Sequence, residues 1–395
     1  MKVNGFFKDI LGSSRVIKER RHLIEEADPN TLYDDPINEV ARQLHPDRTH
    51  VKVTAVKDVS PSARTITFTA DQNDILPPFQ CGQYVSLEFE IDGTLTTRPY
   101  SISSAPFQAR EIEEPFFEIT VRNGKRGQGF VSCWLYDNVK PGDTFIAHLP
   151  FGQFYVEPLR DSKHIVALAG GSGITPFCSM AREIEHGTLD VDLTILYGSV
   201  STRDIILKEQ LEAIQSPRVR IIHVISDQPE YPGEKGFLTA RLIEKYAQQD
   251  STFFVCGPLP MYRFVYKELK KLQVPDKRIR MEVFGAPVNI MQEEGYPLDM
   301  QPQTFRLLVV RGIHEDVVEA KSTEPLAVAL ERAAIKNHTR CRSGACGACR
   351  CKLISGKVFI PSTGDGRRAA DKQYSYVHAC STYPLSDCTI KIPIL

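Results

Sequence analysis

The sequence has no apolar run long enough to span a bilayer as a helix, which takes about 20 residues. It also lacks an excess of charge of either sign, because its 395 residues carry a formal net charge of −1. The chain as a whole is therefore not expected to bind nucleic acid or a membrane surface through charge. The first residues lack the pattern of a secretory signal sequence. We expect a cytoplasmic protein without a transmembrane segment, in a compartment that keeps thiols reduced.

Cysteine is not scarce, but its distribution argues against a disulfide framework. Six of the ten cysteines lie between Cys341 and Cys388, and four of those fall within eleven residues. Such crowding in a reduced compartment indicates a metal site. Residues 304–395 also carry a formal charge of +6, whereas the rest of the chain carries −7. The sequence thus ends in a basic, cysteine-rich module that follows an acidic body.

The cysteine spacing predicts an iron–sulfur cluster. Cys341-x4-Cys346-x2-Cys349, followed after thirty residues by Cys380, is the plant-type pattern for [2Fe–2S] binding. A zinc site is the alternative, but it normally uses paired C-x2-C elements and a tetrahedral ligand set. Cys351 is more simply explained as a packed thiol. We predict that the metal ligands are Cys341, Cys346, Cys349 and Cys380.

The stretch from Cys341 to Val358 resembles the cluster loop of plant-type ferredoxins, and the resemblance extends over residues 304–395. It implies an α+β domain of the β-grasp type with the cluster near the surface. The return segment departs from the ferredoxin pattern, since it reads His378-Ala-Cys-Ser and is preceded by the basic Gly364-Asp-Gly-Arg-Arg.

Two different sequence patterns precede this domain. From Val51 onward, short β-branched runs alternate in period two and are separated by Gly, Pro and Asp, which predicts a small antiparallel β-barrel. From His164 onward, continuous apolar runs alternate with helical stretches, which predicts an α/β domain with a parallel sheet. Residues 285–303 show no periodicity and are interpreted as a linker.

The first motif of the barrel is Arg98-Pro-Tyr-Ser. An arginine offers two parallel hydrogen bonds to a phosphate, and an aromatic ring can stack on a flat heterocycle. Taken alone, the motif is equally well explained as a basic and aromatic strand. About thirty residues later, Gly127-Gln-Gly-Phe-Val-Ser is a glycine-rich turn that opens a helix, a ready site for a pyrophosphate.

Together the two motifs resemble the flavin domain of the ferredoxin–NADP reductase superfamily. The resemblance implies that Arg98 meets a flavin phosphate, that Tyr100 stacks on the flavin ring and that Ser101 lies near its N5 atom. The second motif favours FAD, with FMN as the alternative. The implied flavin-binding residues are Arg98, Pro99, Tyr100, Ser101, Gly129, Phe130, Val131 and Ser132.

A glycine-rich turn, Gly170-Gly-Ser-Gly-Ile-Thr-Pro, ends an apolar run and opens a helix. An ordinary tight strand–helix turn is an equally good explanation of this motif by itself. Cys256-Gly-Pro ends another such run, and the pair resembles the nucleotide domain of the same superfamily. The resemblance implies NAD(P)H binding, with Cys256 near the path of the hydride; a purely packed Cys256 is the alternative. The implied residues are Gly170, Gly171, Gly173, Thr175, Pro176, Cys256, Gly257 and Pro258.

The choice between NADH and NADPH depends on the segment that contains Ser199 and Arg203. Either side chain could bind a 2′-phosphate, but Asp204 follows at what looks like a helix cap. We favour NADH. Glu282 and Phe284 would end the nucleotide domain near the flavin, as weaker assignments.

The predicted order of domains is an N-terminal extension, a flavin-binding barrel, a nucleotide-binding α/β domain, a linker and a ferredoxin domain. The extension is interpreted as a loosely packed helix, with a docking arm as the alternative. The boundaries are 1–48, 49–158, 159–284, 285–303 and 304–395.

These three modules make chemical sense only in series, because a hydride carries two electrons and the cluster accepts one. The sequence predicts an NAD(P)H:acceptor oxidoreductase that passes single electrons through its own cluster to a partner redox protein such as an oxygenase. Tyr100, Ser101 and Cys256 are the predicted catalytic residues. The order of modules resembles the reductases of Rieske-type oxygenases, of phenylacetyl-CoA epoxidation and of hybrid-cluster proteins. A cofactor-binding sensor without turnover is the alternative, as is a reductase of small acceptors.

Overall fold

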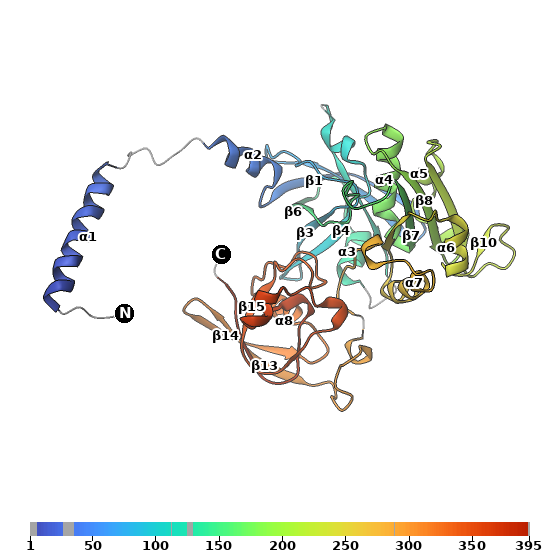
Figure 1. The fold of residues 1–395 in the computed structure, drawn as a ribbon. Helices are drawn as coiled ribbons and strands as arrows, with labels where there is room; N and C mark the ends of the chain where they lie inside the picture. The colour runs from blue at the N-terminus through green and yellow to red at the C-terminus, as the bar shows by residue number, and fades with distance from the viewer. Residues whose placement is uncertain (1–5, 27–34, 112, 125–128, 288, 394–395) are drawn as a thin grey trace. The chain divides into compact units, whose positions relative to one another are not determined.

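The computed structural model describes residues 6–26, 35–111, 113–124, 129–287 and 289–393. The chain divides into an N-terminal unit, Met1–Gln43, and a main unit, Leu44–Leu395. The N-terminal unit contains helix α1 (Phe6–Glu26) and most of helix α2 (Pro36–Leu44), shown in Figure 1. The described apolar side chains of both helices are exposed. The helix expected in this extension is present as α1, with intrahelical ion pairs between Arg15 and Glu19 and between His22 and Glu26.

The main unit begins with an antiparallel sheet of order β4-β3-β6-β1-β2-β5. In β1, Val51 and Val53 are buried and the residue between them is exposed, as the period of a strand requires. A bridge between Ile102 and Ile119 joins the end of β4 to β5, so the sheet closes into a barrel. Its elements are β1 (Thr49–Ser60), β2 (Ala63–Ala70), β3 (Tyr84–Ile91), β4 (Thr94–Ser101), η1 (Pro106–Arg110), β5 (Phe117–Arg122), α3 (Phe130–Asn138) and β6 (Thr144–Phe151).

The second sheet is parallel, with the order β10-β9-β8-β7-β11-β12. Helices α4 and α5 pack on one core of this domain, and α6 and α7 pack on another, so both faces of the sheet are covered. The chain leaves β7 toward β8 and later returns on its other side as β11, which makes β7 the switch point of the topology.

The strands of this domain run over β7 (His164–Gly170), β8 (Asp192–Ser199), β9 (Val219–Ile225), β10 (Glu234–Lys235), β11 (Thr252–Cys256) and β12 (Ile279–Met281). The helices run over η2 (Gly171–Ile174), α4 (Thr175–His186), η3 (Thr202–Asp204), α5 (Lys208–Glu212), α6 (Ala240–Tyr246), α7 (Leu259–Lys271) and η4 (Asp276–Arg278).

The third sheet, of order β14-β13-β19-β15-β17, packs against helix α8 around a core of its own. Strands β13 and β19 are parallel and the other pairs are antiparallel, as in an α+β domain. The elements are η5 (Ile290–Gln292), β13 (Thr304–Arg311), β14 (His314–Lys321), α8 (Leu326–Arg332), β15 (Arg350–Ser355), β16 (Val358–Phe359), η6 (Ser362–Gly364), α9 (Ala369–Gln373), β17 (Tyr376–His378), η7 (Ala379–Ser381), β18 (Tyr383–Pro384) and β19 (Cys388–Lys391).

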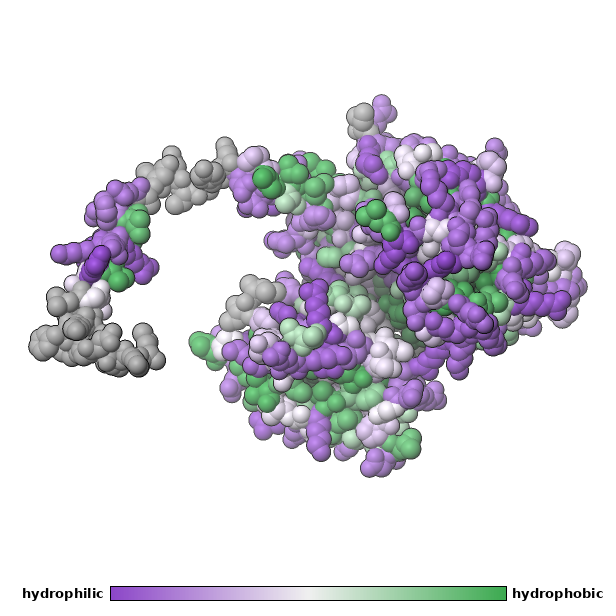
Figure 2. Space-filling view, viewed as in Figure 1, coloured by the Kyte–Doolittle hydropathy of each residue, from purple (hydrophilic) through white to green (hydrophobic). Residues whose placement is uncertain are grey.

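The three sheets confirm the predicted fold class: an antiparallel barrel, a parallel α/β domain and an α+β domain follow one another along the chain. Cys351 is fully buried in the core of the third domain, in agreement with its interpretation as a packed thiol. Figure 2 shows hydrophilic residues over most of the visible face, with hydrophobic residues gathered over part of the C-terminal domain, and the large apolar side chains of Leu159 and Ile313 are exposed. Among the described residues, no helix is both long and apolar enough to cross a membrane.

Candidate active site and cluster-binding loop

A cavity of about 760 Å³ lies where the barrel meets the carboxyl ends of parallel strands β7, β8, β9 and β11. Open α/β sheets bind their ligands at this place, outside the strand ends at a switch point, and the volume suits a cofactor. Eleven of the residues predicted to bind cofactors line it: Pro99, Tyr100, Ser101, Ser132, Gly170, Gly171, Gly173, Thr175, Cys256, Gly257 and Pro258. The remaining predicted flavin and nucleotide residues, Arg98, Gly129, Phe130, Val131 and Pro176, are not among its lining residues. Gly127, the start of the second flavin motif, lies outside the described residues.

The turn after β7 and the turn after β11 pack directly on each other. A Cβ atom on Gly173 would lie 2.1 Å from the carbonyl oxygen of Cys256, and one on Gly170 would lie 2.4 Å from the sulfur of Met261. At position 173 only glycine allows this approach, because the atoms that a Cβ would meet are backbone, whereas at position 170 the Met261 side chain could move aside. The hydroxyl of Tyr197 donates to the carbonyl of Gly171 at 2.9 Å and so ties the first turn to β8. Helix α4 then starts beside the cavity at Thr175, whose own N–H donates to the carbonyl of Ser172, and Pro176 follows it. The positive end of the helix dipole, rather than the N–H groups of these two residues, would therefore favour an anion here.

Cys256 ends β11 and is buried at the wall of the cavity. Burial raises the pKa of its thiol, and the nearby Glu282 carboxyl adds to the effect, while the Tyr262 hydroxyl opposes it. The side chain is therefore a neutral thiol at neutral pH. Tyr262 also accepts from the backbone N–H of Gly257 at 3.2 Å and donates to the carbonyl of Glu282. This tyrosine thus fixes the turn against the segment that follows β12.

Strand β4 presents Pro99, Tyr100 and Ser101 to the same cavity. The hydroxyl groups of Tyr100 and Ser132 are 3.0 Å apart, so the strand is hydrogen-bonded to helix α3. Burial raises the pKa of Tyr100 to about 12, although the Ser132 hydrogen bond acts in the opposite direction. The Tyr100 hydroxyl is consequently a neutral donor at physiological pH.

Arg98 lies on the same strand two residues before Tyr100, at the boundary between the barrel and the third domain. Its guanidinium donates to the Thr96 hydroxyl at 2.5 Å and to the Thr97 carbonyl at 2.7 Å. It lies 4.0 Å from the carboxylate of Glu331 on α8. Burial and the adjacent Arg342 lower the pKa of Arg98 to about 10, while Glu331 raises it. The group remains charged at neutral pH, which is what phosphate binding requires.

The cysteine loop of the third domain brings the four predicted ligands together. Cys341 lies within hydrogen-bonding reach of Cys346 and Cys380, and Cys349 lies within reach of Cys380. The backbone N–H of Gly344 donates to the sulfur of Cys380 at 3.2 Å. Cys346 is exposed, whereas the other three are buried.

The donor chemistry of this loop fits a [2Fe–2S] cluster, which needs four soft thiolates and backbone N–H groups directed at sulfur. Within the described ranges, no group of three or more His, Cys, Asp or Glu side chains is arranged to hold a single metal ion. A binuclear cluster does not require such convergence, because two protein ligands serve each iron.

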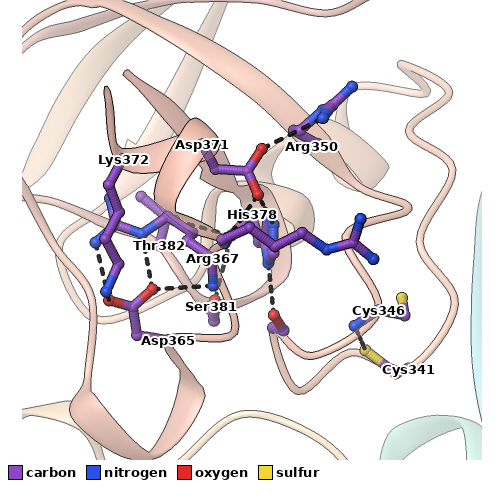
Figure 3. A network of polar contacts seen from close by, with 12 residues as sticks. Cys341, Cys346, Arg350, Asp365, Arg367, Asp371, Lys372, His378, Ser381 and Thr382 are labelled. Atoms are coloured by element: carbon purple, nitrogen blue, oxygen red, sulfur yellow. Dashed lines mark hydrogen bonds and ion pairs between the residues drawn. The ribbon is translucent and has the colours of Figure 1, made fainter. Parts of the chain in front are cut away.

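A polar network fixes the return segment to the cysteine loop (Figure 3). The buried His378 donates from Nδ1 to the carbonyl of Gly344 at 2.5 Å, and its Nε2 lies 3.7 Å from Asp371. Asp371 pairs in turn with Arg350 at 3.3 Å. His378, at which this chain departs from the ferredoxin pattern, therefore stabilises the cysteine loop by a hydrogen bond to the Gly344 carbonyl.

The cysteine loop lies close to the point where the barrel and the nucleotide domain meet. Charges on Cys341 and Cys346 and on Glu282 act on Tyr84 of β3, whose pKa is raised chiefly by burial. The rings of Tyr84 and Phe284 are in edge-on contact, with centroids 5.3 Å apart. Residues of all three domains thus converge here.

Tyr197, Tyr262 and Arg122 also belong to the site, although no sequence motif pointed to them. The two tyrosines lie in a buried strand and an amphipathic helix, where an aromatic residue is ordinarily core. Arg122 ends β5 and lines the cavity; a Cβ atom on Gly171 would lie 3.0 Å from its guanidinium. The only sequence feature that could have indicated its role in the site is its position at the end of a strand, just before a glycine-containing stretch.

The fold and the cavity define an oxidoreductase built from a flavin domain, a nicotinamide-nucleotide domain and an iron–sulfur domain. Family models agree: an oxidoreductase FAD-binding domain matches residues 50–155, an oxidoreductase NAD-binding domain matches 167–267, and a 2Fe-2S iron-sulfur cluster binding domain matches 310–385. The chain belongs to the family of NAD(P)H-dependent flavin and [2Fe–2S] reductases that includes the reductase components of oxygenases.

Among its relatives, the glycine betaine monooxygenase reductase subunit of Chromohalobacter salexigens is 30% identical over 362 residues, covering 87% of this chain and 95% of that protein. The protein of the same description from Pseudomonas aeruginosa is 30% identical over 371 residues, covering 90% and 98%. A solved structure of phthalate dioxygenase reductase shares the fold, with a TM-score of 0.63 and 21% identity over 87% of this chain and 98% of that one.

Proposed function

We propose that this reductase uses the cavity between barrel and parallel sheet to hold a nicotinamide ring against a flavin ring. The observation that carries the proposal is that the Tyr100 strand and the Cys256 turn, from two domains, line one cavity. When bound, the flavin accepts the two electrons of a hydride and releases them singly, and the cluster carries one electron at a time. Tyr100 and Ser101 would orient the flavin, and the neutral Cys256 thiol would border the nicotinamide.

The turn after β7 would bind the nucleotide pyrophosphate through the N-terminus of α4. Arg98, with Gly129, Phe130, Val131 and Ser132, would bind the phosphates of FAD. Pro99, Thr175, Pro176, Gly257 and Pro258 would shape the two turns.

NADH is the proposed electron donor. Asp204 lines the cavity, whereas Arg203 is exposed and is not among the lining residues. A carboxylate can accept a hydrogen bond from a ribose 2′-hydroxyl but repels a 2′-phosphate. The position of Asp204 therefore favours NADH over NADPH.

Cys341, Cys346, Cys349 and Cys380 would bind the cluster, and electrons would leave from it to a protein acceptor. We propose an oxygenase component as this acceptor, because several relatives matched over at least 95% of their own length are described as reductase components of monooxygenases. The domain boundaries predicted from the sequence are proposed unchanged. A cytoplasmic location is proposed as well, since the four cysteines that would bind the cluster are thiols outside any disulfide, as expected in a reducing compartment.

The test is anaerobic stopped-flow reduction of the holoprotein by NADH and by NADPH, with flavin and cluster absorbance followed separately. In the wild type, flavin absorbance should fall first and cluster absorbance second, faster with NADH. In Cys346→Ser, flavin absorbance should fall as in the wild type without a cluster phase. A wild-type cluster that stays oxidised while the flavin is reduced would show that the electron relay is wrong.

A further inference from the structure

The third domain contacts the flavin domain through one carboxylate that meets two arginines. Glu331, at the end of α8, accepts from both terminal nitrogens of Arg342, one of them at 3.1 Å. The same carboxylate lies 4.0 Å from Arg98 on strand β4. The side chains of Glu331 and Arg342 are about nine-tenths buried, with 11% and 9% exposed. An ion pair at this depth is screened far less than one on the surface.

Hydrogen bonds to strand β4 surround this group. The carbonyl of Thr97 accepts from Arg98 at 2.7 Å and from Arg342 at 3.4 Å. The hydroxyl of Thr97 donates to the carbonyl of Thr339 at 2.6 Å. Strand β4 and the start of the cysteine loop are therefore directly hydrogen-bonded, next to the carboxylate.

Arg342 connects this contact to the cysteine loop itself. It follows Cys341 directly, and its backbone adopts φ +56°, a left-handed conformation that is rare for a residue with a side chain. Such a conformation persists only where the surroundings hold it. The bidentate pair with Glu331 supplies that restraint, so the carboxylate fixes both the loop backbone and its distance from β4.

We propose that Glu331 is a positioning residue for electron transfer from the flavin to the cluster. By pairing with Arg342 and Arg98, it holds the cysteine loop against the strand that carries Tyr100 and Ser101. The inference rests on the proposed function, which assigns that strand to the flavin and that loop to the cluster. Removing the charge would leave two arginines facing each other across the boundary, and like charges repel.

The experiment uses the holoprotein variant Glu331→Gln, which keeps the shape of the side chain and removes its charge. After mixing with NADH, flavin absorbance should fall at the wild-type rate, whereas the following cluster phase should slow at least about tenfold, or about 1.4 kcal/mol in the barrier. The electron paramagnetic resonance spectrum of the reduced cluster should stay the same, which a damaged cluster would not allow.

Glu324→Gln is the matched control. Glu324 lies in the same domain and pairs with Arg332 at 2.7 Å, within that domain. This variant should transfer electrons at the wild-type rate. Equal slowing in both variants would overturn the proposal, because the effect would then follow any loss of negative charge.

A wild-type cluster phase in Glu331→Gln would also overturn it. If Glu331→Gln does not retain its cluster, Thr97→Val is used instead, because it removes the hydrogen bond to Thr339 by a change in the flavin domain alone. Slowed electron transfer to the cluster in Thr97→Val supports the proposal, and unchanged transfer contradicts it. If NADH reduces neither centre in the wild type, the proposed function fails instead, whatever the variants do.

Discussion

Gly344 allows the cysteine loop to pack closely against Gly364 and against Ser381 of the return segment. Its φ is +77°, and a Cβ atom there would lie 2.0 Å from the carbonyl oxygen of Gly364 and 2.5 Å from the hydroxyl of Ser381. The same residue donates its N–H to Cys380 and its carbonyl accepts from His378. One added methyl group would therefore separate the loop from both.

We expect Gly344→Ala to be purified with little iron and without cluster absorbance while it keeps its flavin. The measurements are iron per protein chain and the visible spectrum. Gly142→Ala is the matched control, because Gly142 also has a left-handed φ, +100°, but a methyl group added there would meet nothing within 4 Å. That variant bears only the conformational cost, about 1 kcal/mol, and should keep its cluster. Full iron content in Gly344→Ala would contradict the prediction.

Asp204 is the second residue whose charge bears on function. Asp204 lines the cavity, and its carboxylate accepts from the Ser201 hydroxyl at 2.8 Å. We expect Asp204→Asn to lower the preference for NADH over NADPH, measured as the ratio of kcat/KM values, about tenfold, since it removes the repulsion of a 2′-phosphate. Asp227→Asn, at an exposed site that does not line the cavity, should leave the ratio unchanged. An unaltered ratio in the first variant would refute this role.

At the scale of elements, the two strand–helix turns act as one structure. Gly173 of the first turn approaches the Cys256 carbonyl of the second so closely that any side chain must part them. Both turns line the cavity, and because they are in contact, neither can change its position there without moving the other. The elements around them cover the sheet on both faces, so the turns have no room to shift inward.

Gly173→Ala should therefore weaken NADH binding at least about tenfold through overpacking, a distortion that typically costs about 1–3 kcal/mol. Flavin content should stay normal because the barrel is untouched. Titration of the oxidised protein with NAD⁺ and the rate of flavin reduction at several NADH concentrations measure the effect. Gly187→Ala, at the other end of α4 with φ +88° and open space around it, is the control. A wild-type dissociation constant in Gly173→Ala would count against this packing argument.

The elements were predictable where the cause was local. Period-two alternation indicated the barrel strands, continuous apolar runs indicated β7 and β11, and cysteine spacing indicated the loop. The pairing of Glu331 with Arg98 was not predictable, because these residues are far apart in sequence and each is an ordinary surface charge by type. Tyr262 was missed for a related reason: an aromatic on an amphipathic helix is usually core, and only the structure shows its hydroxyl on the Cys256 turn.

At the scale of the whole molecule, Met1–Gln43 forms a unit separate from Leu44–Leu395. All three family models match within residues 50–385. We expect a chain that begins at Leu44 to keep its flavin, its cluster and the wild-type rate of cluster reduction by NADH. Stopped-flow reduction and thermal unfolding of the shortened and full chains test this. A slower relay in the shortened chain would assign the extension a part in electron transfer.

The Glu331 contact also limits how such a protein can be recombined. Its three domains follow one another along the chain, so their order alone would allow a ferredoxin domain from another reductase to be joined at the linker, residues 285–303, with no other change. The contact, however, is made by residues 97–98 on one side and by residues 331–342 on the other. A chimaera that receives only one of these two stretches would contain the right cofactors, but its flavin and ferredoxin domains would lack matching contact residues. Both stretches must be transferred together for an exchanged domain to remain a working one.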